Sequence, residues 1–255
     1  MKKILMLVLS LILALPFTAY AGNWTSSSKI GVGKFNYTET GDSDAGTNYS
    51  LSQRFNYHEG LFMLSLKGVL DYVPANYTGA TMGGTAITGN TAYTLSDFSA
   101  GAGIDKSFFR STNELYLSLG ELNHSFMAAN SSFSNGGAGY DENYQVKYLN
   151  LTYKNIYPIN DVISNVFKIS YLKGLSGTAT TKHFSNVNFE FNLSAEAGYC
   201  VTEGLRYKLN SKWSITGDVY YSALFFSHSN ENEIFYEPSS MTHETGLQTG
   251  LNYNF

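Results

Sequence analysis

The sequence predicts an all-β fold, a transmembrane antiparallel up-and-down β-barrel of about ten strands, with 8 or 12 strands as the other possible counts. Apolar and polar residues alternate along most of the chain, which is typical of strands whose two faces meet different surroundings. After residue 21, no apolar run approaches the ~18 residues that a membrane helix needs. Aromatic residues make up 15% of the 255 residues and charged residues only 14%, well below the charged fraction usual in soluble domains.

The first 21 residues have the order of a cleaved secretory signal peptide. Lys2 and Lys3 precede the apolar run Ile4 to Leu15, and the small-x-small sequence Ala19-Tyr20-Ala21 follows. An N-terminal anchor helix is the alternative, but this apolar run is short for a membrane span. We therefore expect residues 1–21 to be removed and residues 22–255 to form one barrel domain.

Strict alternation is clearest in the segment that begins at Val187. One face carries only apolar residues, while the other carries charged, amide, hydroxyl and small residues. Successive side chains of a strand point to opposite sides, so this pattern predicts one apolar and one polar face. The apolar face is Val187, Phe189, Phe191, Leu193, Ala195, Ala197, Tyr199 and Val201.

The same pattern places the other strands. We expect them at residues 28–38, 47–57, 61–72, 92–106, 113–123, 142–154, 163–174, 185–209, 212–228 and 241–255. The connections alternate in length, which is typical of a barrel with long outer loops and short periplasmic turns. Long connections rich in Gly, Asn, Ser and Thr are expected at residues 39–46, 73–91, 124–141, 175–184 and 229–240. An even strand number places both termini on the periplasmic side and the long loops outside the cell.

The strand at 185–209 is unusually long. Its odd positions stay apolar over about 23 residues, with Glu203 the charged exception, whereas a tilted span needs ~9 to 11 residues. Either the strand rises well past the bilayer, or Thr202-Glu203-Gly204 forms an extra hairpin. We favour the tall strand, because an extra hairpin would give an odd strand number. The segments 28–38 and 142–154 alternate poorly, which indicates β-bulges.

A soluble β-sandwich also alternates, so the choice depends on what covers the apolar face. Here that face is rich in Tyr and Phe near strand ends, as in the aromatic girdles of membrane barrels. Unpaired backbone groups cost several kcal/mol in lipid, so the sheet must close on itself.

The end of the chain resembles a known class. The sequence Leu251-Asn252-Tyr253-Asn254-Phe255 is similar to the C-terminal strand of Gram-negative outer-membrane β-barrel proteins, the small barrels with a C-terminal Phe signature. The segment Gly204 to Ile215 resembles a hairpin that recurs in them. The resemblance implies an outer-membrane location, contact with membrane lipid and lipopolysaccharide, and recognition of Leu251, Tyr253 and Phe255 by the barrel-assembly machinery.

Charged residues on the polar faces are expected to line the barrel interior. About ten strands enclose a lumen only slightly wider than that of eight-stranded barrels, which side chains fill. We interpret the set first as a plug of salt bridges and second as the lining of a narrow pore. Its members are Arg54, Lys67, Asp105, Lys168, Glu196, Arg206, Lys208 and Asp218.

The sequence contains little that indicates catalysis, a metal or a cofactor. His243-Glu244 lacks the second His of a zinc-protease motif, and Asp42-Ser43-Asp44 lacks the later acidic ligands of a calcium loop. With 16 Lys and Arg against 20 Asp and Glu, nucleic-acid binding is not expected. Weak catalytic candidates, placed near the outer ends of their strands, are Asp71, Asp97, Glu190, His228 and Glu244.

These observations predict a non-enzymatic envelope or surface protein of the outer membrane, with loops able to bind a partner and no cofactor. A narrow passive pore is one alternative. The other is an outer-membrane hydrolase, cleaving protein or modifying lipopolysaccharide, with an acidic and His-containing site at the rim. Ten-stranded outer-membrane proteases carry Asp-x-Asp and Asp-x-His pairs, and neither is found at a matching strand end. The oligomeric state and the ligand stay open.

Overall fold

The computed structural model describes residues 24–80, 84–129, 131–136, 139–184, 187–193, 196–229 and 238–255. The expected signal peptide, residues 1–21, lies outside these ranges. Within them, no helix has the length and apolar character needed to cross a membrane.

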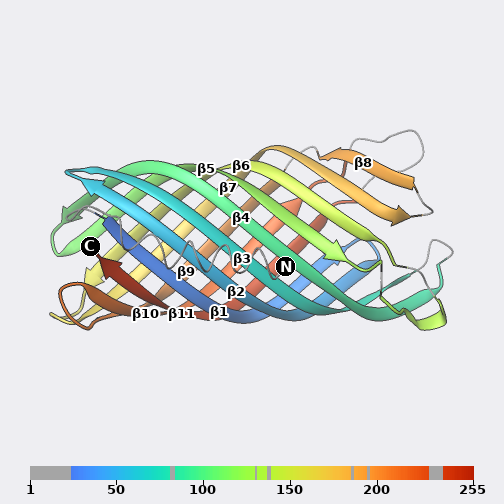
Figure 1. Cartoon of the computed structure of the whole chain (residues 1–255), viewed down its shortest axis with the longest axis horizontal. Helices are drawn as coiled ribbons and strands as arrows, with labels where there is room; N and C mark the ends of the chain where they lie inside the picture. The colour runs from blue at the N-terminus through green and yellow to red at the C-terminus, as the bar shows by residue number, and fades with distance from the viewer. Residues whose placement is uncertain are drawn as a thin grey trace.

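The described chain is an antiparallel barrel closed through the pairing of β1 with β11 and of β6 with β7 (Figure 1). Strands that follow each other in the chain pair with each other, except β8 and β9, which both pair with β7. The strands are β1 (Trp24–Glu39), β2 (Asp42–Glu59), β3 (Phe62–Ala80), β4 (Ala86–Phe108), β5 (Ser111–Met127), β6 (Asp141–Pro158), β7 (Ile163–Phe184), β8 (Val187–Leu193), β9 (Glu196–Lys208), β10 (Trp213–Phe226) and β11 (Ser240–Asn254).

Segments β8 and β9 together form one wall strand of the barrel. Both pair with β7, and the register continues unchanged from Lys173 opposite Ala197 to Gly177 opposite Leu193. The barrel therefore has ten strands, as the alternation predicts, and the tall strand expected at 185–209 is confirmed. No hairpin interrupts this strand at Thr202. Thr202 lies in the middle of β9 and pairs with Lys168 of β7.

The barrel has two different ends. The near end carries Trp24 and Phe255, and the backbone N–H of Phe255 donates to the carbonyl of Trp24 at 3.0 Å. The far end carries the β5–β6 connection with its short 3₁₀ helix η2 (Ser134–Gly136), and β8 lies at the same end (Figure 1).

Several expected long connections are mostly strand. The turn between β1 and β2 is only Thr40-Gly41, where Gly41 has the positive φ of 92° that suits glycine. Residues 73–80, 86–91 and 175–184 also lie in strands. Their Gly, Asn and Thr residues predicted loops, but the neighbouring strands pair with nearly all of them and so satisfy their backbone groups. The longer connections are residues 128–140 and 227–239.

One predicted bulge is present and one is absent. The β6–β7 register shifts between Lys147 and Tyr148, which leaves Leu175 of β7 as an extra residue. The expected bulge in 28–38 is wrong, because β1 keeps an unbroken register with both neighbours. Alternation is poor there because serines occupy both faces of β1 and glycines stand at two positions of one face.

The outer face of the barrel carries a band of apolar side chains, and aromatic side chains lie at both edges of this band. Large apolar side chains point outward and are exposed, with Phe62 at 73%. At the far edge, Tyr49 lies opposite Tyr72 on the adjacent strand. At the near edge, the rings of Trp213 and Tyr253 lie 4.4 Å apart. This arrangement suits lipid tails around the band and lipid headgroups at its two edges.

Beyond the apolar band, the walls continue toward the far end and enclose a packed interior. On β5, the outward residues after Leu119 are polar, namely Glu121, Asn123 and Ser125, while the inward ones are buried. Two clusters of buried side chains fill this part of the lumen. They comprise Leu122, Tyr144, Val146, Tyr148, Ala179, Phe191, Leu193 and Phe226, and Phe35, Tyr37, Val73, Ala75, Tyr93, Phe126 and Ala128.

Candidate functional site in the lumen

A cavity of about 680 Å³ occupies the lumen between the near end and the packed far half. Its lining begins at Trp24 and Phe255 and includes Asp71 and Glu244, which lie beside the packed far half. Polar residues on the inward face of nearly every strand contribute to it. The cavity is therefore a polar pocket that ends inside the barrel.

Ion pairs cross the wall of this cavity. Lys154 Nζ lies 2.7 Å from Glu114 Oε1, and His58 Nδ1 lies 3.1 Å from Asp105 Oδ2. Lys29 pairs with Asp218. Each carboxylate lies beside a basic side chain from another strand, so these contacts link different strands across the lumen.

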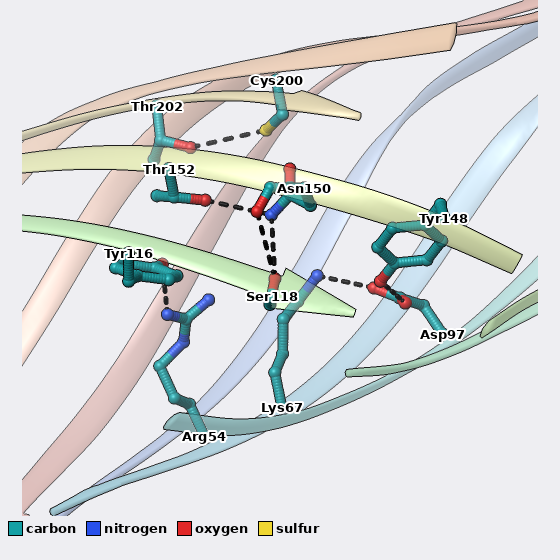
Figure 2. A network of polar contacts seen from close by, with 10 residues as sticks. All are labelled: Arg54, Lys67, Asp97, Tyr116, Ser118, Tyr148, Asn150, Thr152, Cys200 and Thr202. Atoms are coloured by element: carbon teal, nitrogen blue, oxygen red, sulfur yellow. Dashed lines mark hydrogen bonds and ion pairs between the residues drawn. The ribbon is translucent and has the colours of Figure 1, made fainter. Parts of the chain in front are cut away.

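A denser network lies along the inner wall formed by β2 to β6 (Figure 2). Asp97 accepts hydrogen bonds from Lys67 Nζ, at 2.7 Å, and from the Tyr148 hydroxyl. Arg54 donates to the Tyr116 hydroxyl, and its guanidinium carbon lies 5.1 Å from the centre of that ring. These side chains reach across the lumen from β2, β3, β4, β5 and β6, which narrows the passage at this level.

His124 closes the lumen above this network. Its side chain is 1% exposed, and neither ring nitrogen has a hydrogen-bond partner among the described residues. Tyr93 and Phe226 stack on it at 5.2 and 6.0 Å. Burial without a partner lowers the pKa of His124 from 6.5 to about 4, so the ring is neutral at pH 7.

The predicted lumen residues divide into two groups. Six of the eight border the cavity, namely Arg54, Lys67, Asp105, Lys168, Arg206 and Asp218. Glu196 lies outside the cavity and is buried against Gly174 and Gly177 of β7. Lys208 is exposed at the near end of β9.

The weak catalytic candidates do not form one site. Asp71 and Glu244 border the inner end of the cavity, while Asp97 is held by Lys67 and Tyr148. Glu190 on β8 and His228 after β10 are exposed at the far end. No group of three or more His, Cys, Asp or Glu side chains suited to a metal ion occurs in the ranges that the structure describes.

Some residues that line the lumen were not predicted from the sequence. Lys29, Glu114 and Lys154 form ion pairs that were not predicted. Parity along β5 and β6 would have placed Glu114 and Lys154 inside, because both share a face with buried residues. Asn48 and Tyr220 carried no signal, since an Asn or a Tyr is common on either face of a barrel strand.

No family model and no curated protein sequence matches the chain. Among solved structures, it is similar to the outer membrane protease OmpT from Escherichia coli, with a TM-score of 0.60 and 10% identity, over 93% of this chain and 99% of that chain. The translocator domain of the autotransporter NalP from Neisseria meningitidis gives 0.48 at 9% identity, over 100% and 96%. Ail of Yersinia pestis gives 0.32 at 12% identity, over 91% and 100%.

The fold is that of an outer-membrane β-barrel protein. The similarity to OmpT extends over the whole barrel, and the exposed apolar band with its aromatic edges is the surface that such a fold presents to lipid. At 10% identity, the likeness concerns the fold alone. The role of this barrel depends on its own lumen and far end.

Proposed function

We propose that the chain is a non-enzymatic surface protein of the outer membrane, whose far end binds a partner outside the cell. The observation that carries this proposal is the packed far half. Aromatic side chains and the buried His124 fill the lumen beyond the apolar band, so the barrel projects from the membrane as a closed, rigid support. Binding segments are commonly held on such a support.

The sidedness follows from the same proposal. Long connections of outer-membrane barrels face outward, and the short turns face the periplasm. The long connections 128–140 and 227–239 lie at the far end, so the far end faces the exterior and both termini face the periplasm. The apolar band contacts lipid, and lipopolysaccharide surrounds its outer edge.

The C-terminal residues also acquire a role. Tyr253 packs on Trp213, and the Phe255 ring packs edge-on against Tyr253 at 4.8 Å. Strand β11 closes the barrel against β1. We therefore propose that the barrel-assembly machinery recognises Leu251, Tyr253 and Phe255 before β11 pairs with β1.

Two other functions are less well supported. A passive pore requires an open lumen, whereas buried side chains occupy the far half. A hydrolase requires catalytic side chains that converge on one site, and the five candidates do not converge. Asp71 and Glu244 border the cavity, Asp97 is paired with Lys67, and the other two are exposed at the far end.

Trimming the β5–β6 connection tests the binding proposal. Met127 and Asp141 are paired, so residues 129–139 can be exchanged for Asn-Gly without altering the strands. We expect cells that express this variant to attach at least tenfold less to polystyrene and to fixed epithelial cells than cells with the native chain. An exchange of the near-end residues 159–162 is the control. Equal attachment of both variants, with heat-modifiable migration intact, contradicts the proposal.

A further inference from the structure

Two carboxylates at the inner end of the cavity have no cation opposite them. Asp71 and Glu244 both border the cavity, and neither forms an ion pair within the described part of the chain. Lys67, on the same face of β3 as Asp71, is already paired with Asp97 at 2.7 Å. Two partly desolvated carboxylates without a cation are costly.

A continuous patch of wall brings these groups together. Asp71 lies directly opposite Ser50, and Asn48 follows two residues along on the same face of β2. Asn48 lies opposite Gly33, Gly33 opposite Gly246, and Gly246 opposite Tyr220. Glu244 is two residues from Gly246 on the same face. Five adjacent strands, β3, β2, β1, β11 and β10, therefore build the patch.

Asn48 is the centre of this patch. It is 1% exposed, and its Nδ2 donates a hydrogen bond to Glu244 Oε2 at 2.9 Å. Its Oδ1 has no hydrogen-bond partner among the described residues, and the same is true of Asp71 Oδ1 and of the Tyr220 hydroxyl. Buried polar atoms are normally satisfied. The Tyr220 hydroxyl can itself donate, so the two pure acceptors, Asn48 Oδ1 and Asp71 Oδ1, are the atoms that indicate a missing donor.

We propose that Asp71 and Glu244, with the Tyr220 hydroxyl beside them, bind the ammonium group of a small organic molecule that enters the lumen from the near end. An ammonium has three N–H donors and no acceptor, which matches three oxygen groups on the cavity lining, namely the free Oδ1 of Asp71, the Tyr220 hydroxyl and the Glu244 carboxylate. Asn48 does not line the cavity and holds Glu244 in place through its Nδ2. A divalent metal is less suited, because only two strong ligands are present.

The rest of the cavity limits the ligand. A volume of about 680 Å³ lies within the range of ~300 to 1,000 Å³ typical of small-molecule sites. Farther toward the near end, the lining includes Arg54, Lys168 and Arg206, which form no ion pair with described residues. A second cationic group would be repelled there, whereas an acid group would be attracted. The fitting class is a molecule with an ammonium at one end and an acid at the other.

Titration with 6-aminohexanoate tests this site, with hexanoate as the probe that lacks the ammonium. The full barrel in detergent is observed by saturation-transfer NMR. We expect 6-aminohexanoate to bind and hexanoate to bind at least tenfold more weakly. Asp71→Asn and Glu244→Gln are each expected to weaken the binding of 6-aminohexanoate at least tenfold, because each removes a charged hydrogen-bond acceptor.

Two variants separate binding from folding. Tyr220→Phe keeps the ring that lies against Gly246 and removes only the hydroxyl, which lies over Gly33, so we expect a threefold or greater loss of affinity in a normally folded barrel. Glu190→Gln, an exposed carboxylate at the far end, should leave affinity unchanged. Equal binding of both probes, unchanged affinity in Tyr220→Phe and Glu244→Gln, or binding of calcium without 6-aminohexanoate overturns the proposal. None of these outcomes bears on attachment by the far end.

Discussion

Lowering the pH from 7 to 4 is expected to destabilise the far half of the barrel by about 3 kcal/mol through His124 alone. The folded pKa of about 4 lies below the value of 6.5 that the ring has when exposed. Between pH 6.5 and 4, the His124 ring therefore binds a proton in the unfolded chain but not in the folded chain. The contribution of neutral His124 is complete above pH 6.5 and is lost progressively as the pH falls toward 4. Amide hydrogen exchange along β5 measures this loss.

His124→Phe isolates this effect from the other acidic groups. Phenylalanine keeps a ring between Tyr93 and Phe226 but does not titrate. We expect the variant to lose the part of the pH dependence between pH 6.5 and 4 that His124 causes, while the remainder, which includes Asp44, persists. Burial raises the pKa of the Asp44 carboxyl even though Thr91 and Tyr93 donate hydrogen bonds to it. An unchanged pH dependence in His124→Phe would show that the ring is not buried neutral.

Removing the rings around His124 should open the barrel. Tyr144 and Phe226 are both buried, and their ring centres lie 5.1 Å apart. Each change to Ala is expected to cost about 3 to 5 kcal/mol and to leave a void. In planar bilayers, we expect no stepwise conductance from the native chain and clear steps from Tyr144→Ala/Phe226→Ala.

Tyr199→Ala provides the matched control, because this ring points outward and is 40% exposed. The control should stay silent, since the loss of a lipid-facing ring leaves the lumen filled. Steps from the native chain would support the narrow pore. Silence in the double variant, provided that it still migrates as a heat-modifiable barrel, would mean that other side chains close the lumen.

The strands were predictable because their signal is local. Alternation predicts a strand whichever strands lie alongside, and all ten wall strands form near the expected positions. The single apolar face predicted over 187–201 is wrong, because Phe191 and Leu193 are buried in the lumen whereas Tyr199 is exposed on the outer face. The connections were not predictable in this way. Residues 73–80 carry loop-like Asn, Gly and Pro, yet β3 continues through them because β2 and β4 pair with them. Such pairing depends on distant residues.

The candidate site was predictable only in part. Parity along each strand places Asp71, Lys67 and Asp218 inside the barrel. It does not tell which cation meets which carboxylate, because partners such as Lys29 and Asp218 are brought together by the closure of β1 on β11 and β10. The aromatic filling was also missed. Phe126 was assigned to an outer loop, and Phe35 and Tyr93 were not expected in the lumen, whereas the tall walls turn all three inward.

The chain contains one cysteine, and its position tests the closed lumen most directly. Cys200 has a free thiol and borders the cavity. In proteoliposomes, a small membrane-impermeant methanethiosulfonate added outside should label only those barrels whose near end faces outward. That fraction is measured independently by protease removal of a tag at the C-terminus. Equality of the two fractions is the result that a closed far half predicts, whereas labelling of every barrel regardless of orientation would contradict it.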